Sequence, residues 1–407
     1  MSIQLISISH KTADLNIRSC FALDRETQIE YLKETISLGY IEECALLSTC
    51  NRLEVYLYGP DENQREIFSE AERVLLRRIT FPAGIDGAEY LRFYEGEKAE
   101  RHLFFVAAGL DSMVIGEDQI LGQVKEAQQQ ARNAGTMGTF LDTCFRYAIT
   151  AAKRVKTETA LSRTSVSTAT IAVKAAREYL GDLKGKNVLL LGASGKIGNS
   201  IFKNLLSEGE THVYMTTRQR CHGGTGGRYL ELPYGERYEW LDQMDVIISA
   251  TSSPHYTMTL EKVKKALITE KHRVFVDLAV PPDIDKRVRE LSNTGYCNMD
   301  DFARVADENN RKKEKEAAAA VDILEDYRVQ FKKWMIFQKS FGAVQRMKEK
   351  ICRQAENKGM DKAVSHFFFA LKESLAPEQL EIFMEALKKV EGSYEENCRG
   401  RLWTRRL

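Results

Sequence analysis

The spacing of hydrophobic and polar positions changes twice along the chain and divides it into three segments. Up to about residue 155, short strand-like runs at 4–9, 45–48 and 55–58 alternate with helical stretches at 25–38 and 66–79. The stretch from 100 to 156 is mostly helical, interrupted by the glycine-containing run "GLDSMVIGEDQILGQ". This mixture predicts an N-terminal α+β domain covering residues 1–156.

The second segment has a different periodicity. An alanine- and threonine-rich connecting helix is predicted over 157–183. It is followed by four strand-like runs, in "NVLLLG", "HVYMTTR", "DVIISATS" and "RVFVDLAVP", with helical or loop segments between them. Strands that alternate with helices build a parallel, doubly wound sheet. The pattern therefore predicts a Rossmann-type domain that, with its connecting helix, covers residues 157–298.

The third segment, 299–407, reads as a long helix from Asp300 followed by amphipathic segments at 341–355 and 377–390. A heptad-like stripe marks the long helix, and a second apolar face lies at 380–390. About sixty C-terminal residues make a marginal core, so we expect a homodimer joined through residues after about 340. The alternative is that the stripe packs entirely within one chain. The two faces consist of Ala317, Ala320, Leu324, Tyr327, Phe331 and Trp334, and of Leu380, Phe383, Leu387 and Val390.

Composition narrows the class of protein. The 407 residues are too many for one core, and a formal charge of +1 gives no global field for a nucleic-acid or membrane partner. No apolar run is long enough to cross a bilayer, and the N-terminus lacks the features of a secretory signal. The eight cysteines show no CxxC pair and no metal-ligand spacing, which favours a reducing cytoplasm. We expect no metal, no membrane and no DNA partner.

A glycine-rich turn follows the first strand of the second segment. It has the spacing GxxGxxG and opens a helix, which is the context of a dinucleotide-binding turn. The glycines allow a pyrophosphate to approach the backbone, and the helix N-terminus attracts it. The predicted cofactor-binding residues here are Gly192, Ala193, Ser194, Gly195, Lys196, Ile197 and Gly198.

The end of the next strand indicates which dinucleotide binds. NAD sites usually have an Asp or Glu there to hold the ribose 2′-hydroxyl. This strand ends "MTTRQR", with Thr217 and Arg218 and no acid. Hydroxyl and guanidinium groups suit a 2′-phosphate, so we predict NADPH. The alternative is that the arginines are only solvated surface.

Cys50 lies in "LLSTCNRLEVY", between polar residues where two apolar runs meet. It is either a small buried residue or a nucleophile presented on a turn. Beside a nicotinamide cofactor, a thiolate can attack an activated carbonyl and hold the acyl group as a thioester, which hydride then reduces to an aldehyde. Cys44, on a more apolar stretch, is expected to be core.

Four stretches together resemble the glutamyl-tRNA reductase family: "STCNRLEVY", "ISHKTA", "RHLFFVAAGLDSMVIGEDQILGQVKEA" and "VFVDLAVPPDID". The resemblance runs from near the N-terminus to about Trp334. It implies reduction of glutamyl-tRNA(Glu) to glutamate-1-semialdehyde with NADPH and release of the tRNA, the first step of five-carbon tetrapyrrole synthesis. It also raises the prospect of a glutamate-1-semialdehyde aminomutase as a partner.

The same resemblance implies roles for individual residues. Cys50 would be the nucleophile, and His102 would assist near the thiol by lowering its pKa or protonating the departing ribose oxygen. Arg52 would bind the γ-carboxylate of the glutamyl group with its forked guanidinium. The residues implied to line the glutamyl pocket are Thr49, Asn51, Arg52, Ser112, Glu117, Asp118, Gln119 and Gln123.

Two other functions compete with this interpretation. One is an NADP-dependent thioester reductase that acts on a small acyl substrate without tRNA. The other is a non-enzymatic, NAD(P)-sensing regulator, which would need a DNA-reading element that the sequence does not show. A basic stretch with Arg146, Lys153, Arg154 and Lys156 would meet tRNA phosphates or form a solvated helix face.

Overall fold

A computed structural model describes residues 1–113, 115–117, 119–159, 161, 168–207, 211–217, 229–302 and 314–399. The chain folds into two compact units, Met1–Phe331 and Lys332–Leu407. The first unit contains a four-stranded antiparallel sheet and a six-stranded parallel sheet. In the described part of the chain, no helix is both long and apolar enough to cross a membrane.

The antiparallel sheet has the strand order β2-β3-β1-β4. Strands β1 (Ser2–Ser9), β2 (Glu43–Ser48) and β3 (Arg52–Gly59) confirm the three predicted runs, whereas β4 (Arg92–Glu95) was not predicted. All of β3 is buried, because helices cover both faces of the sheet. Its residues still alternate, because Leu53, Val55 and Leu57 enter the aliphatic core on one face, whereas Arg52, Glu54 and Tyr56 are joined by buried hydrogen bonds.

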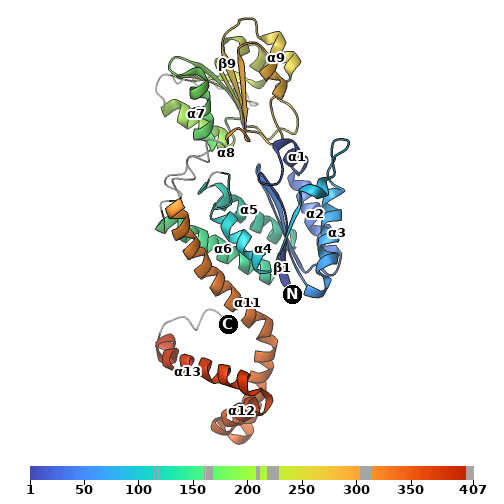
Figure 1. Ribbon diagram of the computed structural model, residues 1–407, viewed down its shortest axis with the longest axis vertical. Helices are drawn as coiled ribbons and strands as arrows, with labels where there is room; N and C mark the ends of the chain where they lie inside the picture. Colours follow the sequence, from blue (N-terminus) through green and yellow to red (C-terminus); the bar gives the residue numbers. More distant parts are fainter. Residues whose placement is uncertain are drawn as a thin grey trace. The chain divides into compact units, whose positions relative to one another are not determined.

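The helices of this part lie on the two faces of the sheet (Figure 1). On one side, α2 (Arg25–Ser37) and α3 (Gln64–Leu76) cover a core of aliphatic side chains, as predicted from their spacing. The other side is covered by α4 (Glu97–Ala107), α5 (Gln119–Ala134) and α6 (Thr139–Glu158). Asp24 begins α2 by accepting a hydrogen bond from the Thr27 amide at 2.8 Å, and Asp14 begins the short α1 (Leu15–Cys20) in the same way.

The parallel sheet has the order β10-β9-β8-β5-β6-β7, which is the order of a doubly wound dinucleotide-binding domain. The predicted strands are β5 (Asn187–Leu191), β6 (His212–Thr217), β8 (Val246–Ser249) and β9 (Arg273–Asp277). Two further strands, β7 (Tyr229–Pro233) and β10 (Thr294–Asn298), extend the sheet at its edges. Helices α7 (Thr168–Leu180) and α8 (Lys196–Ser207) cover one face, and α9 (Leu260–Ala266) the other (Figure 1).

The single connecting helix predicted over 157–183 is wrong. Helix α6 ends at Glu158, where Thr159 adopts an extended conformation with φ −120° and ψ 161°, and α7 begins at Thr168. The Thr159 hydroxyl donates to the carbonyl of Val155 at 2.8 Å. Threonine side chains compete for backbone hydrogen bonds in this way, which weakens their preference for the helix interior.

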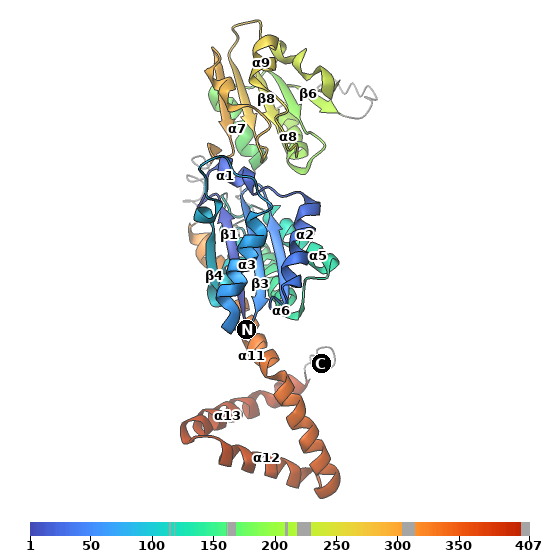
Figure 2. The same ribbon diagram turned by 90° about the vertical axis from the view of Figure 1, so that its right-hand side faces the viewer.

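The third segment consists of α11 (Glu314–Lys358), α12 (Met360–Ser374) and α13 (Pro377–Arg399), joined by short turns (Figure 2). The predicted stripe is present, with Ala320, Leu324 and Phe331 fully buried. The segment predicted at 341–355 is not a separate helix but the continuation of α11, and α12 was not predicted. The predicted start of the long helix at Asp300 leads into residues 303–313, which lie outside the described ranges.

Candidate active site

Cys50 lies at the tip of a hairpin between the antiparallel strands β2 and β3. The Thr49 amide donates to the Arg52 carbonyl at 2.8 Å, which closes the turn. The Thr49 hydroxyl accepts hydrogen bonds from the amides of Asn51 and Arg52, both at 3.1 Å. The Thr49 side chain therefore stabilises the turn. The Cys50 side chain makes none of these hydrogen bonds.

A small pocket surrounds the Cys50 side chain. Its volume is about 20 Å³, which is room for about one water molecule. The structure thus brings the hairpin tip together with the loop after α4 and the start of α5. The lining residues are Thr49, Cys50, Asn51, Arg52, Ser112, Met113, Glu117, Gln119, Ile120, Gln123, Thr168 and Ile197.

Most of the residues implied for the substrate pocket therefore meet around Cys50, although "STCNR" and "GEDQILGQ" are far apart in the sequence. Asp118 lies outside the described residues. Met113, Ile120 and Thr168 were not identified from the sequence, because apolar residues and a helix-start threonine give no chemical signal. Thr168 belongs to the site through its hydroxyl, which donates to Glu117 at 2.9 Å.

The resting state of Cys50 is a thiol. Burial, followed by the negative charge of Glu117, raises its pKa to about 11. Two guanidinium groups, those of Arg18 and Arg52, oppose this rise. Local positive charge favours a thiolate, and burial disfavours it. Loss of the Glu117 charge or entry of water would thus lower the pKa of the thiol.

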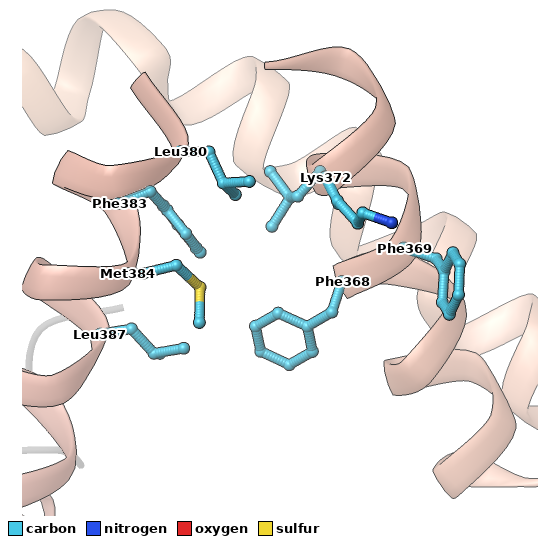
Figure 3. A pocket seen from close by; sticks show the side chains of 8 residues that line it. Phe368, Phe369, Lys372, Leu380, Phe383, Met384 and Leu387 are labelled. Atoms are coloured by element: carbon cyan, nitrogen blue, oxygen red, sulfur yellow. The ribbon is translucent and has the colours of Figure 1, made fainter. Parts of the chain in front are cut away.

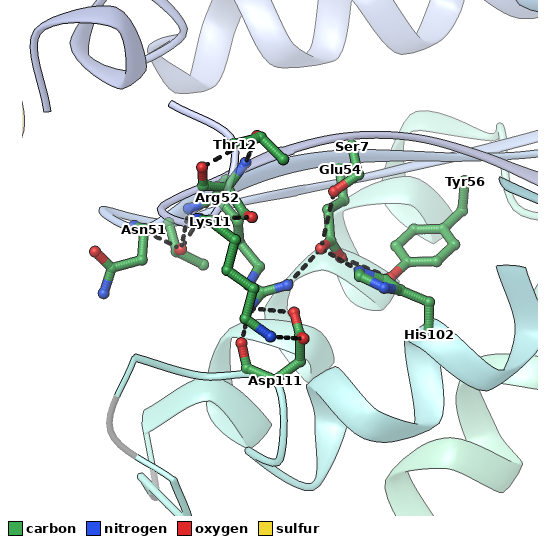
Figure 4. A network of polar contacts seen from close by, with 11 residues as sticks. Ser7, Lys11, Thr12, Asn51, Arg52, Glu54, Tyr56, His102 and Asp111 are labelled. Carbon is green, nitrogen blue, oxygen red and sulfur yellow. Dashed lines mark hydrogen bonds and ion pairs between the residues drawn. The ribbon is translucent and has the colours of Figure 1, made fainter. Parts of the chain in front are cut away.

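Next to the pocket, Arg52 begins a buried network of charged groups (Figure 4). Its Nη1 donates to Glu54 Oε1 at 2.6 Å, and its Nη2 donates to Asp111 Oδ2 at 3.0 Å. Lys11 forms a second ion pair with Asp111. Burial alone would raise the pKa of Glu54, but His102 and Arg52 outweigh burial and hold it well below its ordinary value. Both arms of the Arg52 fork are thus occupied by protein carboxylates.

His102 belongs to this network, not to the lining of the Cys50 pocket among the described residues. Its Nε2 lies 2.7 Å from Glu54 Oε1, and its ring stacks on Tyr94 with centroids 5.2 Å apart. The Tyr56 hydroxyl donates to the other oxygen of Glu54 at 2.6 Å. The geometry connects His102 to Cys50 only indirectly, through Glu54 and Arg52. Its predicted role beside the thiol stays a prediction.

Several buried polar atoms have no hydrogen-bond partner among the described residues. Oδ1 of Asn51 and Nδ1 of His10 are two of them. The backbone amide of His10 donates to the Asn51 carbonyl at 2.9 Å, so the two residues are adjacent. Burial, then the charges of Arg52, Lys11 and Arg18, lower the pKa of His10 to about 4. Sequence reasoning did not select His10, although "ISHKTA" contains it.

A second pocket lies at the carboxyl ends of β5, β6, β7 and β8, with a volume of about 610 Å³. This size suits a ligand, and the place is where doubly wound sheets bind dinucleotides. Of the predicted cofactor residues, five line this pocket. The lining residues are Gly192, Ala193, Ser194, Gly195, Asn199, Phe202, Met215, Thr216, Thr217, Glu231, Tyr234, Ala250, Thr251 and Ser252.

The glycine turn fits a dinucleotide. Gly192 has φ +82°, and a Cβ there would lie 2.5 Å from the Ala250 carbonyl oxygen. A Cβ at Gly198 would lie 2.1 Å from the Gly192 carbonyl oxygen. Glycine is thus required at both positions, which leaves the backbone accessible where α8 begins.

The other predicted cofactor residues lie differently. Lys196 pairs with Glu126 at 2.6 Å and is largely exposed. Ile197 lines the Cys50 pocket, so the start of α8 borders both pockets. Arg218 lies outside the described residues. Glu231 and Tyr234 were missed because β7 was not predicted.

Comparison with known proteins gives two family matches. Residues 6–159 match the family described as "Glutamyl-tRNAGlu reductase, N-terminal domain", and residues 174–305 match the family described as "Shikimate / quinate 5-dehydrogenase". The glutamyl-tRNA reductase of Methanothrix thermoacetophila is 33% identical over 368 residues, covering 86% of this chain and 84% of the relative. That of Pelobacter propionicus is 34% identical over 347 residues, covering 82% and 77%. A solved glutamyl-tRNA reductase from Methanopyrus kandleri is 26% identical with a TM-score of 0.46, covering 96% of this chain and 93% of that one.

Proposed function

The chain belongs to the glutamyl-tRNA reductase family, and we propose that it performs the reaction of this family through a thioester on Cys50. The protein is an oxidoreductase of the first step of tetrapyrrole synthesis, with glutamyl-tRNA as substrate and a nicotinamide dinucleotide as reductant. The observation that carries the thioester is the hairpin tip, where Thr49 holds the turn and Cys50 borders the pocket.

The first half of the reaction is an acyl transfer. The Cys50 sulfur attacks the ester carbonyl of glutamyl-tRNA, the carbon–oxygen bond to the terminal ribose breaks, and the ribose oxygen takes a proton. Because the resting pKa of Cys50 is about 11, the thiol must lose its proton as the substrate binds. The carboxylate of Glu117 lines the same pocket and is the group positioned to accept that proton.

The glutamyl group is recognised by polar groups around Cys50. Arg52 attracts the γ-carboxylate, which competes with Asp111 for the Nη2 arm of the guanidinium. The unpartnered Oδ1 of Asn51 is an acceptor for the α-ammonium group. The pocket of about 20 Å³ must widen to admit a glutamyl group. If the γ-carboxylate displaces Asp111 from Arg52, binding of the substrate would itself widen the pocket.

The cofactor that we propose is NADPH. When bound, it supplies the hydride that reduces the thioester carbonyl to an aldehyde, while the carbon–sulfur bond breaks and Cys50 is released. Gly192, Gly195 and the amides at the start of α8 would hold the pyrophosphate. Thr216 and Thr217 at the end of β6 present hydroxyls, whereas an NAD site has a carboxylate there. Glu231 on β7 is the one acid among the described lining residues, and its carboxylate suits a hydroxyl or amino group.

Mass spectrometry tests the thioester directly. Protein incubated with glutamyl-tRNA and no NADPH should carry a glutamyl adduct on the peptide containing Cys50. Cys20→Ser is the matched control, because Cys20 is a partly exposed thiol outside the pocket. An adduct at another residue, or none while the semialdehyde still forms when NADPH is added, would contradict the mechanism. Free glutamyl esters offered in place of glutamyl-tRNA would separate this function from a reductase of small acyl substrates.

The second unit supports a homodimer. Among residues 332–393, whose side chains are described, only Met335 and Ala363 are buried hydrophobic residues. A groove of about 500 Å³ between α12 and α13 is lined mainly by apolar side chains, with Phe368, Phe383 and Met384 pointing into it (Figure 3). Exposed apolar surface of this extent marks an interface. Because the unit has almost no core of its own, we propose that a second copy of the chain covers this surface.

Light scattering at micromolar concentration tests the homodimer. Full-length protein should have the mass of a dimer, and Leu387→Glu should shift it towards a monomer. Lys388→Glu is the control, because it adds the same side chain one residue outside the groove. Monomeric wild-type protein would refute the assembly.

Four further predictions concern the compartment, a partner protein, the domain boundaries and the tRNA contacts. The mechanism needs a free thiol, so a reducing compartment such as the cytoplasm suits the protein. Transfer of the reactive aldehyde to glutamate-1-semialdehyde aminomutase stays a prediction, as do the domain boundaries at 156 and 298. The predicted tRNA contacts on α6 are weakened at Arg154, which pairs with Glu158 at 2.7 Å.

A further inference from the structure

The loop that follows β8 borders the cofactor pocket. Ala250, Thr251 and Ser252 line the pocket next to the glycine turn. The amide of Ala250 donates to the Leu191 carbonyl at 3.0 Å, immediately before Gly192. The position of this loop therefore sets both the width of the pocket and the clearance over Gly192.

The first residues of this loop are bound by one buried carboxylate, that of Asp283. Its Oδ2 accepts from the Ser249 hydroxyl at 2.6 Å and from the Thr251 amide at 3.0 Å. Its Oδ1 accepts from the Thr251 hydroxyl at 2.7 Å. Hydrogen bonds to a charged acceptor are stronger than those between neutral groups, and Asp283 is fully buried.

The last residues of the loop are bound by the main chain of the same residue. The carbonyl oxygen of Asp283 accepts from the amides of Thr257 and Met258 at 2.7 and 3.0 Å. It also accepts from the Thr257 hydroxyl at 3.2 Å. One residue thus holds both ends of the loop between 249 and 258.

Asp283 is itself held in place from the sheet. Asp277, at the end of β9, accepts from the Ala279 amide at 3.0 Å and from the Ile284 amide at 2.8 Å. These bonds fold 278–284 back onto the sheet and present Asp283 to the loop. Asp283 is not among the described lining residues of the pocket, so it would act on a ligand only through Thr251 and its neighbours.

We propose that Asp283 is a positioning residue for the dinucleotide: it holds the loop after β8 in the conformation that leaves the pocket open beside the glycine turn. This inference rests on the proposed cofactor site. It adds a specific role for the "PPDID" end of the motif "VFVDLAVPPDID", which the catalytic function did not use.

The test is Asp283→Asn in the full-length protein, with NADPH binding measured by titration of nicotinamide fluorescence. Asparagine keeps the shape but places an amide donor or a neutral oxygen opposite the Thr251 amide and the two hydroxyls. The dissociation constant for NADPH should rise about tenfold, the effect of losing one hydrogen bond to a charged group. Asp285→Asn is the matched control, because Asp285 lies two residues away, is also buried and pairs with Arg287 instead of the loop.

Kinetics separates positioning from a general structural effect. In Asp283→Asn, KM for NADPH should rise while KM for glutamyl-tRNA stays unchanged, because Asp283 is not among the described residues that line the Cys50 pocket. If that variant fails to fold, Thr251→Val and Ser249→Ala replace it. Each removes one hydroxyl donor, and each should raise the dissociation constant about threefold.

The outcomes are distinct. NADPH binding by Asp283→Asn within twofold of wild type, or an equal loss in Asp285→Asn, overturns the role of Asp283, as does unchanged binding in both hydroxyl variants. Wild-type protein that fails to bind NADPH overturns the cofactor assignment itself.

Discussion

Arg52→Lys is the substitution on which the structure makes its most specific prediction. Arg52 has a side chain only 2% exposed, and it bonds Glu54 through Nη1 and Asp111 through Nη2. Lysine keeps the charge but has a single nitrogen, which cannot replace two arms that point to different carboxylates. The side chain at position 52 therefore loses one charge-assisted hydrogen bond, made either to a protein carboxylate or to the γ-carboxylate of the substrate.

The expected loss is about 2 kcal/mol, within the range for a hydrogen bond to a charged group. If that contact is made in the transition state, kcat/KM for glutamyl-tRNA falls about thirtyfold, with a raised KM and a lowered kcat. The free energy of unfolding should fall by a similar amount, because Glu54 stays buried with one fewer partner.

Both quantities need measurement in the same variant. Steady-state kinetics with glutamyl-tRNA gives kcat/KM, and urea unfolding gives the stability. Arg73→Lys is the control, because Arg73 is a half-exposed residue that pairs with Glu70 on the surface of α3. Unchanged kcat/KM together with lower stability would show that Arg52 only supports the fold, and would refute its role in binding the γ-carboxylate.

Three further predictions follow from the structure. Cys50→Ser should abolish semialdehyde formation with an unchanged circular dichroism spectrum, and wild type without NADPH should slowly hydrolyse glutamyl-tRNA; near-normal reductase activity of the serine variant would exclude the thioester. Removing all residues after Ser340 should give a monomer that still binds NADPH, as seen by light scattering and fluorescence; a dimeric truncation would place the interface elsewhere. Burial, reinforced by Asp283, raises the pKa of Asp277 from 3.8 to about 7, so the native state binds the extra proton between these values and stability falls as pH rises through them. Between pH 4 and pH 8 this proton should account for a change on the order of 4 kcal/mol in the free energy of unfolding, and Asp277→Asn should lack this change. Urea unfolding at the two pH values measures it, and an equal change in wild type and variant would contradict the prediction.

Sequence periodicity predicted a helix or strand correctly where the element has one buried face or a continuous apolar run. The predicted strands of both sheets and the helices α2 and α3 are confirmed for this reason. It failed for β4, β7 and β10, which are short strands at sheet edges. Arg92 and Glu95 obscure the pattern in β4, and Pro233 obscures it in β7. It also failed for α12, because a short apolar run such as the one that begins "FFFALKES" does not by itself distinguish a helix from a strand.

The sequence by itself determined which residues carry the proposed chemistry. A cysteine between Thr49 and Asn51, a glycine turn after β5 and a strand end without an acid can be read from neighbouring residues, because turn and helix-start preferences are local. Only the tertiary structure decided how these groups interact. Both arms of Arg52 are occupied, His102 binds Glu54, and Asp283 holds a loop that starts 34 residues before it. Such contacts join residues far apart in the chain, and burial strengthens them by removing water, so no pattern along the sequence records them.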